Sequence, residues 1–201
     1  MTPLRRIVIG VTGASGQPYA RRLLDFLAAH HVELSAEVRV VFSKFGRLVW
    51  NDEIGADPAE TYPFEIHTPG DMLAPFASGS SNFDAMAVVP CSAGTLARIA
   101  TGVSTDLIGR AADVILKERR KLVLVLRESP YNLVHLRNMV AVTEAGAVVM
   151  PASPSFYSAP KDLDALLDTV TARILDQLGI DNRLMHRWTG ELRGATARSS
   201  P

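Results

Sequence analysis

Small and hydroxyl-bearing residues directly follow two short apolar runs of the sequence. Residues 12–16 (Thr-Gly-Ala-Ser-Gly) come after the apolar residues 7–11, and residues 90–96 (Pro-Cys-Ser-Ala-Gly-Thr-Leu) come after residues 85–89. Such turns let backbone N–H groups approach an anion, and the start of a following helix favours negative charge. They indicate either a phosphate site or tight strand-to-helix connections. The spacing of residues 12–16 matches neither the dinucleotide fingerprint nor the Walker A loop, which disfavours NAD and ATP.

Polar residues also follow the other apolar runs. Ser43 and Lys44 come after the second run, where a polar strand end is the simpler interpretation. Arg127 and Glu128 come after the fourth run, and because burying such charges uncompensated is costly, they indicate either a structural ion pair or a site. After the fifth run, a loop with two prolines delivers Tyr157. Ligands of open α/β sheets bind beyond the carboxyl ends of the strands, so all these positions are candidates.

Three further candidates have simpler structural interpretations. Cys91 is a possible nucleophile, but a lone thiol at a strand end is more typical of packing, and no histidine lies near it in sequence. Arg110 and Lys117 are seven residues apart and share one helix face, which is typical of a solvated face. Arg173 lies in the last helical segment, where a surface arginine is the alternative to a ligand-binding one.

The elements that must position these residues alternate along the chain. Short apolar runs bounded by turn residues predict strands buried on both faces, and the segments between them have a helical apolar period. This alternation predicts an α/β fold, a Rossmann-like or flavodoxin-like three-layer sandwich with a mainly parallel sheet. The predicted strands are 7–11, 38–42, 85–89, 122–126 and 147–150, and the predicted helices are 18–29, 45–50, 94–100, 107–119, 132–145 and 163–178.

Two stretches break this alternation and are predicted to be surface excursions or ligand-covering loops. Residues 52–75 are rich in proline and acidic residues, and residues 77–82 are small and polar. No internal repeat or linker divides the chain, so we expect one domain over residues 1–190. Residues 191–201 lack apolar periodicity and are expected to be a tail that is disordered or docked on a neighbour.

Composition narrows the classes of function. The 201 residues contain 21 Lys plus Arg and 21 Asp plus Glu, so the net charge is zero and neither nucleic acid nor an anionic membrane is an expected partner. One cysteine excludes an intrachain disulfide. The five histidines lack metal-ligand spacing, so no metal site is expected. No apolar stretch has the length of about 18 residues that a membrane helix needs, and the cytoplasm is the expected compartment.

In combination, these segments resemble the UbiX-type flavin prenyltransferases. The resemblance runs in family order from residue 10 to about residue 190. It is carried by Thr-Gly-Ala-Ser-Gly at 12–16, Ser-Lys at 43–44, Ala-Ser-Gly-Ser at 77–80, Pro-Cys-Ser-x-Gly-Thr-Leu at 90–96, Arg-Ala-Ala-Asp-Val-x-Leu-Lys-Glu-Arg-Arg at 110–120, Leu-Val-Leu-x-x-Arg-Glu-x-Pro at 122–130, His-Leu-x-x-Met at 135–139, Gly-Ala-Val-x-x-Pro at 146–151, Phe-Tyr at 156–157 and Ala-Arg-Ile-Leu at 172–175.

The resemblance implies that the enzyme joins the dimethylallyl group of dimethylallyl phosphate to N5 and C6 of reduced FMN, giving prenylated FMN and phosphate. The implied FMN-binding residues are Gly13, Ala14, Ser15, Ser43, Ser92, Ala93, Gly94, Thr95 and Arg127. The implied binding residues for dimethylallyl phosphate are Lys117, Arg127, Tyr157 and Arg173. The implied catalytic residues are Glu128, Tyr157 and Ser15, with Glu128 in proton transfer.

The resemblance also implies partners. It implies a homo-oligomer, commonly a dodecamer, with sites between subunits, and a UbiD-type decarboxylase that receives the prenylated FMN. The chain departs from some relatives at Met72, where they carry a tryptophan, so the wall of the prenyl pocket is expected to be softer.

Two other functions remain open on the sequence. The first is an FMN-dependent decarboxylase of the cysteine-decarboxylase kind, although the active-site histidine and Asn-rich loop of those enzymes are missing. The second is a non-catalytic flavin-binding module, which would not need Lys117, Tyr157 and Arg173 together.

Overall fold

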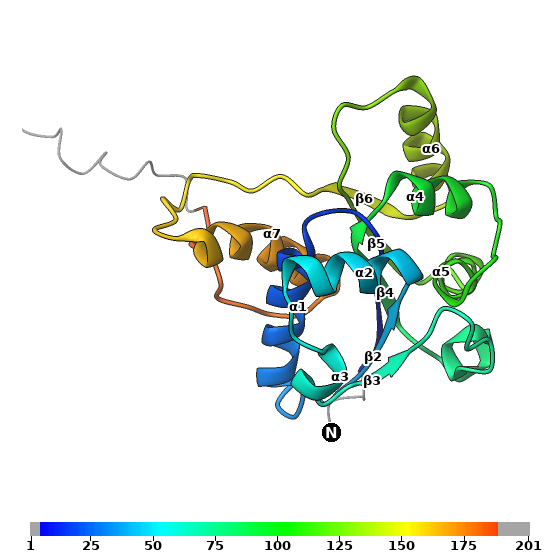
Figure 1. The fold of residues 1–201 in the computed structure, drawn as a ribbon, viewed down its shortest axis with the longest axis horizontal. Coiled ribbons are helices and arrows are strands. Elements are labelled where there is room, and N and C mark those ends of the chain that lie inside the picture. The colour runs from blue at the N-terminus through cyan, green and yellow to red at the C-terminus, as the bar shows by residue number, and fades with distance from the viewer. Residues whose placement is uncertain (1–4, 189–201) are drawn as a thin grey trace, which may run out of the picture.

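The computed structural model describes residues 5–188, which form a six-stranded parallel sheet between two layers of helices (Figure 1). The strands are β1 (Arg5–Val11), β2 (Ala36–Phe42), β3 (Glu65–His67), β4 (Ala85–Cys91), β5 (Lys121–Leu126) and β6 (Val148–Pro151). The helices are α1 (Gln17–His30), α2 (Lys44–Glu53), α3 (Pro58–Thr61), α4 (Ala93–Ala100), α5 (Leu107–Lys117), α6 (Leu133–Glu144) and α7 (Leu163–Gln177), with 3-10 turns at Pro75–Ala77 and Gly79–Ser81.

The strand order β3-β2-β1-β4-β5-β6 creates a switch point between β1 and β4. The chain first builds outward from β1 to β2 and β3, then returns to the other side of β1 with β4 and builds outward again. Ile7 pairs with Ala85 and Gly10 with Val88 across this seam. Connections leave β1 and β4 in opposite directions, so the carboxyl ends of these two strands border the crevice where such folds bind ligands.

Alternate residues of the buried strands face two separate apolar cores. In β1, Ile7, Ile9 and Val11 belong to the core under α1 and α7, whereas Val8 belongs to the core under α4, α5 and α6. Figure 1 shows these two groups of helices on opposite sides of the sheet. Because both faces are covered, the strands are nearly all apolar, as their sequences predicted. The predicted three-layer α/β sandwich is confirmed, and all five strand pairings are parallel.

The structure corrects the prediction for residues 52–75, which contain a helix and an edge strand. Helix α3 begins after Asp57, whose side chain accepts from the backbone N–H of Ala59 at 2.8 Å. Strand β3 pairs Arg39 of β2 with Glu65 and Val41 with His67. With only three residues, of which one is aliphatic, β3 has too little apolar alternation for the pattern to predict it.

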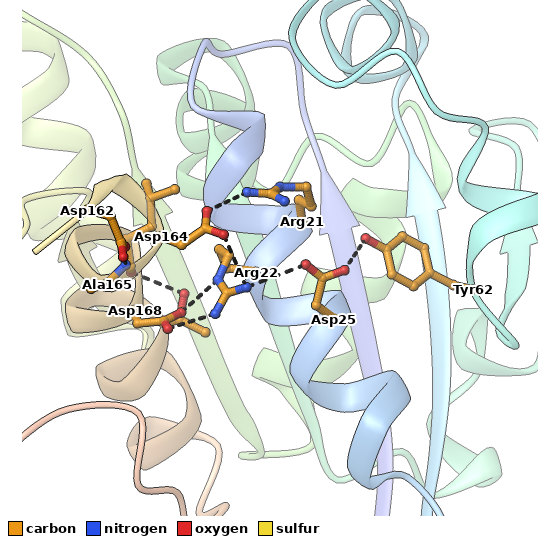
Figure 2. A network of polar contacts seen from close by, with 10 residues as sticks. Arg21, Arg22, Asp25, Tyr62, Asp162, Asp164, Ala165 and Asp168 are labelled. Atoms are coloured by element: carbon orange, nitrogen blue, oxygen red, sulfur yellow. Dashed lines mark hydrogen bonds and ion pairs between the residues drawn. The ribbon is translucent and has the colours of Figure 1, made fainter.

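Helices α1 and α7 are joined by a polar network beside the first core (Figure 2). Arg22 donates two hydrogen bonds to Asp168, of 2.9 and 2.7 Å, and the Asp168 side chain is only 11% exposed. Asp25, one turn along α1, accepts a 2.8 Å hydrogen bond from the hydroxyl of Tyr62. The bidentate pairing of Arg22 satisfies a carboxylate that would otherwise be costly to bury.

Within residues 5–188, no helix combines the length and the apolar character that crossing a bilayer requires. One sheet accounts for all the strands of this part of the chain. The expected domain limit at residue 190 and the tail at 191–201 lie outside the described residues, so they stay predictions.

Candidate functional site at the carboxyl edge of the sheet

Thr12 joins the ends of β1 and β4 at the switch point. Its hydroxyl donates to the carbonyl of Pro90 at 2.7 Å and accepts from the backbone N–H of Ser92 at 2.8 Å. The residue is fully buried, and its bond to Pro90 is buried while its bond to Ser92 is partly buried. They hold the turn after β1 against the turn after β4 and thereby fix the two segments that the sequence singled out.

A cavity of about 500 Å³ opens at this edge of the sheet. Of the predicted flavin-binding residues, five line it: Gly13, Ser43, Ser92, Gly94 and Thr95. Residues from the connections after β1, β2 and β4 therefore converge, as expected for the carboxyl ends of neighbouring parallel strands. The remaining lining residues are Lys44, Phe45, Pro69, Arg98, Thr105 and Asp106.

Three helices begin at this cavity, and each has a side-chain cap. Ser43 accepts from the N–H of Gly46 at 2.9 Å at the start of α2, and Ser92 accepts from that of Thr95 at 3.3 Å at the start of α4. Helix α5 is capped by Asp106, which accepts from the N–H of Gly109 at 2.8 Å. Helix N-termini carry partial positive charge and unpaired N–H groups, so their convergence makes the cavity suitable for an anion.

The start of α1 is different because the chain supplies its own anion there. The Glu53 carboxylate accepts from the backbone N–H groups of Gly16 at 2.9 Å and Gln17 at 2.8 Å. Glu53 is the last residue of α2, so the contact ties α2 to the glycine turn. Residues 13–15 remain as the part of this turn that can face a ligand, with Ala14 buried and Ser15 exposed.

Arg127 and Glu128 lie beside the same glycine turn. The backbone N–H of Arg127 donates to the carbonyl of Cys91 at 3.0 Å, which fixes the connection after β5 against the end of β4. A Cβ atom at Gly16 would lie 3.8 Å from Cγ of Arg127, so the arginine side chain passes close to the turn. Arg127 is exposed and Glu128 is half-buried. The carboxylate of Glu128 accepts a 3.1 Å hydrogen bond from the backbone N–H of Ser129.

Lys117 lies far from this cavity within one chain. It is the last residue of α5, whereas the cavity lies at the start of that helix, and eleven helical residues span about 15 Å. Its ammonium group pairs with Glu118 at 2.5 Å and lies beside Gly79. Arg110, on the same face, donates to the carbonyl of Ala77 at 3.0 Å. The face of α5 that carries both Arg110 and Lys117 therefore points at residues 77–81.

Tyr157 and Arg173 are also separate from the cavity in one chain. Tyr157 is 79% exposed on the loop between β6 and α7, with its ring 6.2 Å from that of Trp188. Arg173 is half exposed on α7 and donates to Asp176 at 2.6 Å. The hydrogen bonds that Arg187 donates to the same carboxylate hold the pKa of Asp176 below its usual value. Ala93, the remaining predicted residue, opens α4 next to Ser92.

Cys91 is a packing residue in this structure. It is completely buried, and this burial raises the pKa of its thiol to about 12. A thiol with so high a pKa supplies no thiolate at neutral pH, so the structure favours the packing interpretation of Cys91 over the nucleophile. Among the described residues, no group of three or more acidic, cysteine or histidine side chains could hold a metal ion.

The sequence interpretation missed Glu53, Arg98, Asp106 and Pro69. Asp106 carried a usable signal, since an aspartate before an apolar helical segment is a typical N-cap. Glu53 and Pro69 lie in or beside the irregular stretch, and their contacts join residues far apart in sequence, such as the 2.9 Å bond from the N–H of Leu107 to the carbonyl of Pro69. Met72, the expected departure, is 45% exposed and does not line this cavity.

Comparison with known proteins identifies relatives across nearly the whole chain. The family model "Flavoprotein" matches residues 1–175. The flavin prenyltransferase UbiX of Methanocaldococcus jannaschii is 43% identical over 185 residues, covering 91% of this chain and 98% of the relative. The fold is also that of two solved structures. AnUbiX in complex with FMN and dimethylallyl pyrophosphate is 41% identical with a TM-score of 0.86, covering 94% of this chain and 100% of the other.

The second structure is the dodecameric FMN-dependent UbiX-like decarboxylase from Escherichia coli O157:H7. It is 40% identical with a TM-score of 0.85, covering 92% of this chain and 100% of the other. A family model that matches residues 1–175 and relatives more than 40% identical over nine-tenths of the chain assign the family. The chain belongs to the flavoprotein family and, within it, to the UbiX flavin prenyltransferases.

Proposed function

We propose that this chain is a flavin prenyltransferase that joins the dimethylallyl group of dimethylallyl phosphate to N5 and C6 of reduced FMN and releases phosphate. The observation that carries the proposal is the cavity at the switch point. Five residues predicted to hold FMN line it, in a chain 43% identical to a flavin prenyltransferase. A related structure holds FMN together with dimethylallyl pyrophosphate, which combines the same flavin with a diphosphate of the same dimethylallyl group.

The cavity fits the phosphate group of FMN. Three helix N-termini and the hydroxyl groups of Ser43, Ser92 and Thr95 offer the donors that a phosphate monoester requires. The glycine turn and Arg127 lie beside it and would border the flavin ring system. Reduced FMN supplies an electron-rich ring as the acceptor of the prenyl group. The chain's part in this step is to hold that ring rigidly against the prenyl donor.

The donor side needs cations because phosphate leaves with the electron pair of the broken carbon–oxygen bond. Lys117, Arg127 and Arg173 are proposed to bind that phosphate, and Tyr157 to donate a hydrogen bond to it. Glu128 is proposed to accept the proton released when the bond to the flavin carbon forms. Ser15 is proposed to assist at the glycine turn.

Lys117, Tyr157 and Arg173 do not reach the cavity in one chain, so we propose that subunits complete each other's sites. A homo-oligomer follows, and the dodecamer of the E. coli relative is the proposed size. We further propose that prenylated FMN passes to a UbiD-type decarboxylase and that the protein is cytoplasmic.

Phosphate release tests this function against its alternatives. The chain is incubated anaerobically with dimethylallyl phosphate, with or without reduced FMN, and phosphate is measured. A prenyltransferase releases phosphate from dimethylallyl phosphate only when reduced FMN is present, and pyrophosphate release from dimethylallyl pyrophosphate, measured in parallel, reports the preferred donor. A flavin-binding module or a cysteine decarboxylase would release none, and that result would remove the proposal.

A further inference from the structure

Arg98 lies at the cavity but belongs to none of the residue sets assigned above. It extends from the second turn of α4 back toward the start of that helix, the direction in which helical side chains point. Its Nη2 donates to Oγ1 of Thr95 at 3.1 Å, and a Cβ atom at Gly94 would lie 3.9 Å from its Nη1. The guanidinium therefore covers the first turn of α4, where that turn faces the cavity.

This is an unfavourable place for a cation without an anion. Helix N-termini repel positive charge, and here α2 and α5 begin at the same cavity as α4. Lys44, at the start of α2, adds a second cation to the lining. The carboxylate of the lining is Asp106, whose Oδ2 lies 3.7 Å from Nη2 of Arg98, beyond hydrogen-bond distance. The other oxygen of Asp106 is engaged by the N–H of Gly109.

The guanidinium is nevertheless held ready for a ligand. Its side chain is 36% exposed, so part of it faces the open cavity. Among the described residues, Thr95 is the one acceptor within hydrogen-bond distance, which leaves other N–H groups of the planar fork available. Such a fork matches two oxygens of a phosphate group.

We infer that Arg98 is a phosphate-binding residue of the flavin site and that the FMN phosphate replaces Asp106 as its nearest anion. The inference rests on the proposed use of FMN and extends it, because it assigns the charge that neutralises the flavin phosphate to this chain's own helix α4. Arg98 would then distinguish FMN from riboflavin, which has the same ring system without the phosphate.

The test is a titration of FMN and of riboflavin into the full chain, followed by flavin fluorescence. Arg98→Gln is expected to raise the Kd of FMN about 10-fold or more, because a charged hydrogen bond is lost, and to change the Kd of riboflavin less than about twofold. Arg98→Lys, which keeps the charge without the fork, is expected to fall between the parent and Arg98→Gln.

Two variants sharpen the result. Arg47→Gln removes the same charge from α2, but Arg47 pairs with Asp57 at 2.8 Å and does not line the cavity, so FMN affinity should stay within about twofold. Asp106→Asn keeps an N-cap but removes the carboxylate facing Arg98, so FMN should bind about two- to fivefold tighter.

Several outcomes would overturn the inference. They are an unchanged Kd of FMN in Arg98→Gln, an equal loss in Arg47→Gln, or an equal loss of riboflavin affinity, which would indicate a distorted site. Failure of the proposed function is distinguishable from these outcomes. Arg98-dependent FMN binding without phosphate release would remove the prenyltransferase proposal alone, whereas phosphate release with an unaffected Arg98→Gln variant would remove the inference alone.

Discussion

Thr12 shows how one side chain determines the geometry of the site. Its hydroxyl serves as donor to β4 and as acceptor from the turn that follows, so it pairs a buried carbonyl and a partly buried N–H of the backbone. From the sequence, Thr12 was interpreted only as part of a turn that is either a phosphate site or a tight strand-to-helix connection. The structure adds that it joins the two strands of the switch point.

Thr12→Val is expected to destabilise the protein by about 1–3 kcal/mol, because the isosteric side chain leaves the Ser92 N–H without its partner and the Pro90 carbonyl with only the longer 3.3 Å bond from the backbone N–H of residue 12. Urea unfolding of the flavin-free protein measures the loss. The control is Thr101→Val, since the hydroxyl of Thr101 bonds to the carbonyl of Ala97 at 2.9 Å in an exposed position. The free energy of unfolding of Thr101→Val should stay within about 0.5 kcal/mol of the parent value. An equal loss of stability in Thr12→Val and Thr101→Val would contradict the role given to Thr12.

At the scale of elements, close packing of α2 against β1 positions one wall of the cavity. A Cβ atom on Gly46 would lie only 2.3 Å from the carbonyl oxygen of Val11, so the first turn of α2 rests directly on the end of β1. This contact also sets the place of Ser43, which caps the helix through the N–H of Gly46. The glycine is thus required for a close approach between backbones rather than for a turn.

Gly46→Ala is expected to cost about 1–3 kcal/mol or more of folding free energy, because backbone rather than a flexible side chain must move. Chemical denaturation gives the value, and FMN titration should show weakened binding as α2 shifts. Gly70→Ala is the matched control, since its added Cβ would meet nothing within 4 Å. If Gly46→Ala were as stable as Gly70→Ala, the close packing of α2 on β1 would be wrong.

The end of α7 offers a test by pH. Hydrogen bonds from Arg187, with help from Asn182 and Arg173, lower the pKa of Asp176 below 3.8 in the folded chain. A lowered carboxyl pKa adds stability that is complete above the unfolded value of 3.8 and is lost as pH falls through the folded value. The stability deficit of Asp176→Asn should therefore be constant near neutral pH and shrink toward zero below pH 3.8.

The measurement is the free energy of unfolding of the parent and of Asp176→Asn from pH 7 down to about pH 2. Glu33→Gln, at an exposed position in the turn after α1, serves as the control for loss of one acidic group. A deficit for Asp176→Asn that does not change with pH would show that the ion pairs with Arg187 and Arg173 contribute nothing to stability.

At the scale of the whole molecule, two observations indicate self-association. Helix α6 exposes Leu133, Val134, Leu136 and Val140, each by 47% or more, and Leu133, Leu136 and Val140 share one face of the helix. Lys117, which is proposed to bind phosphate, is the last residue of α5, whereas the cavity lies at the start of α5. A neighbouring subunit that covers the apolar residues of α6 and places its own Lys117 at this chain's site would account for both observations.

Mixed oligomers test whether Lys117 acts in a neighbour's site. Lys117→Ala and Glu128→Gln are each expected to abolish turnover. Co-assembled one to one, they should regain activity in about a quarter of the sites, where intact Lys117 of one chain meets intact Glu128 of another. The control mixes the two variants after separate assembly and should stay inactive. An inactive co-assembled sample would place both residues in one chain's site.

The sequence predicted those features that depend on local pattern. The five long strands were evident from their apolar runs, and the residues at their carboxyl ends followed from the parallel order, so Ser43, Ser92 and Thr95 were placed correctly at one edge. Strand β3 was missed because its three residues form only through pairing with β2. The Glu53 contacts were missed because they join residues 36 and 37 apart in sequence, which no local period encodes.

The mass of the flavin after an anaerobic incubation tests the central claim most directly. The chain, reduced FMN and dimethylallyl phosphate are combined, and the flavin is extracted and weighed by mass spectrometry. The account predicts FMN heavier by one C5H8 unit, formed only with the protein and the donor both present. Unmodified FMN, recovered from folded protein that has bound it, would contradict the account and leave a flavin-binding protein of another activity.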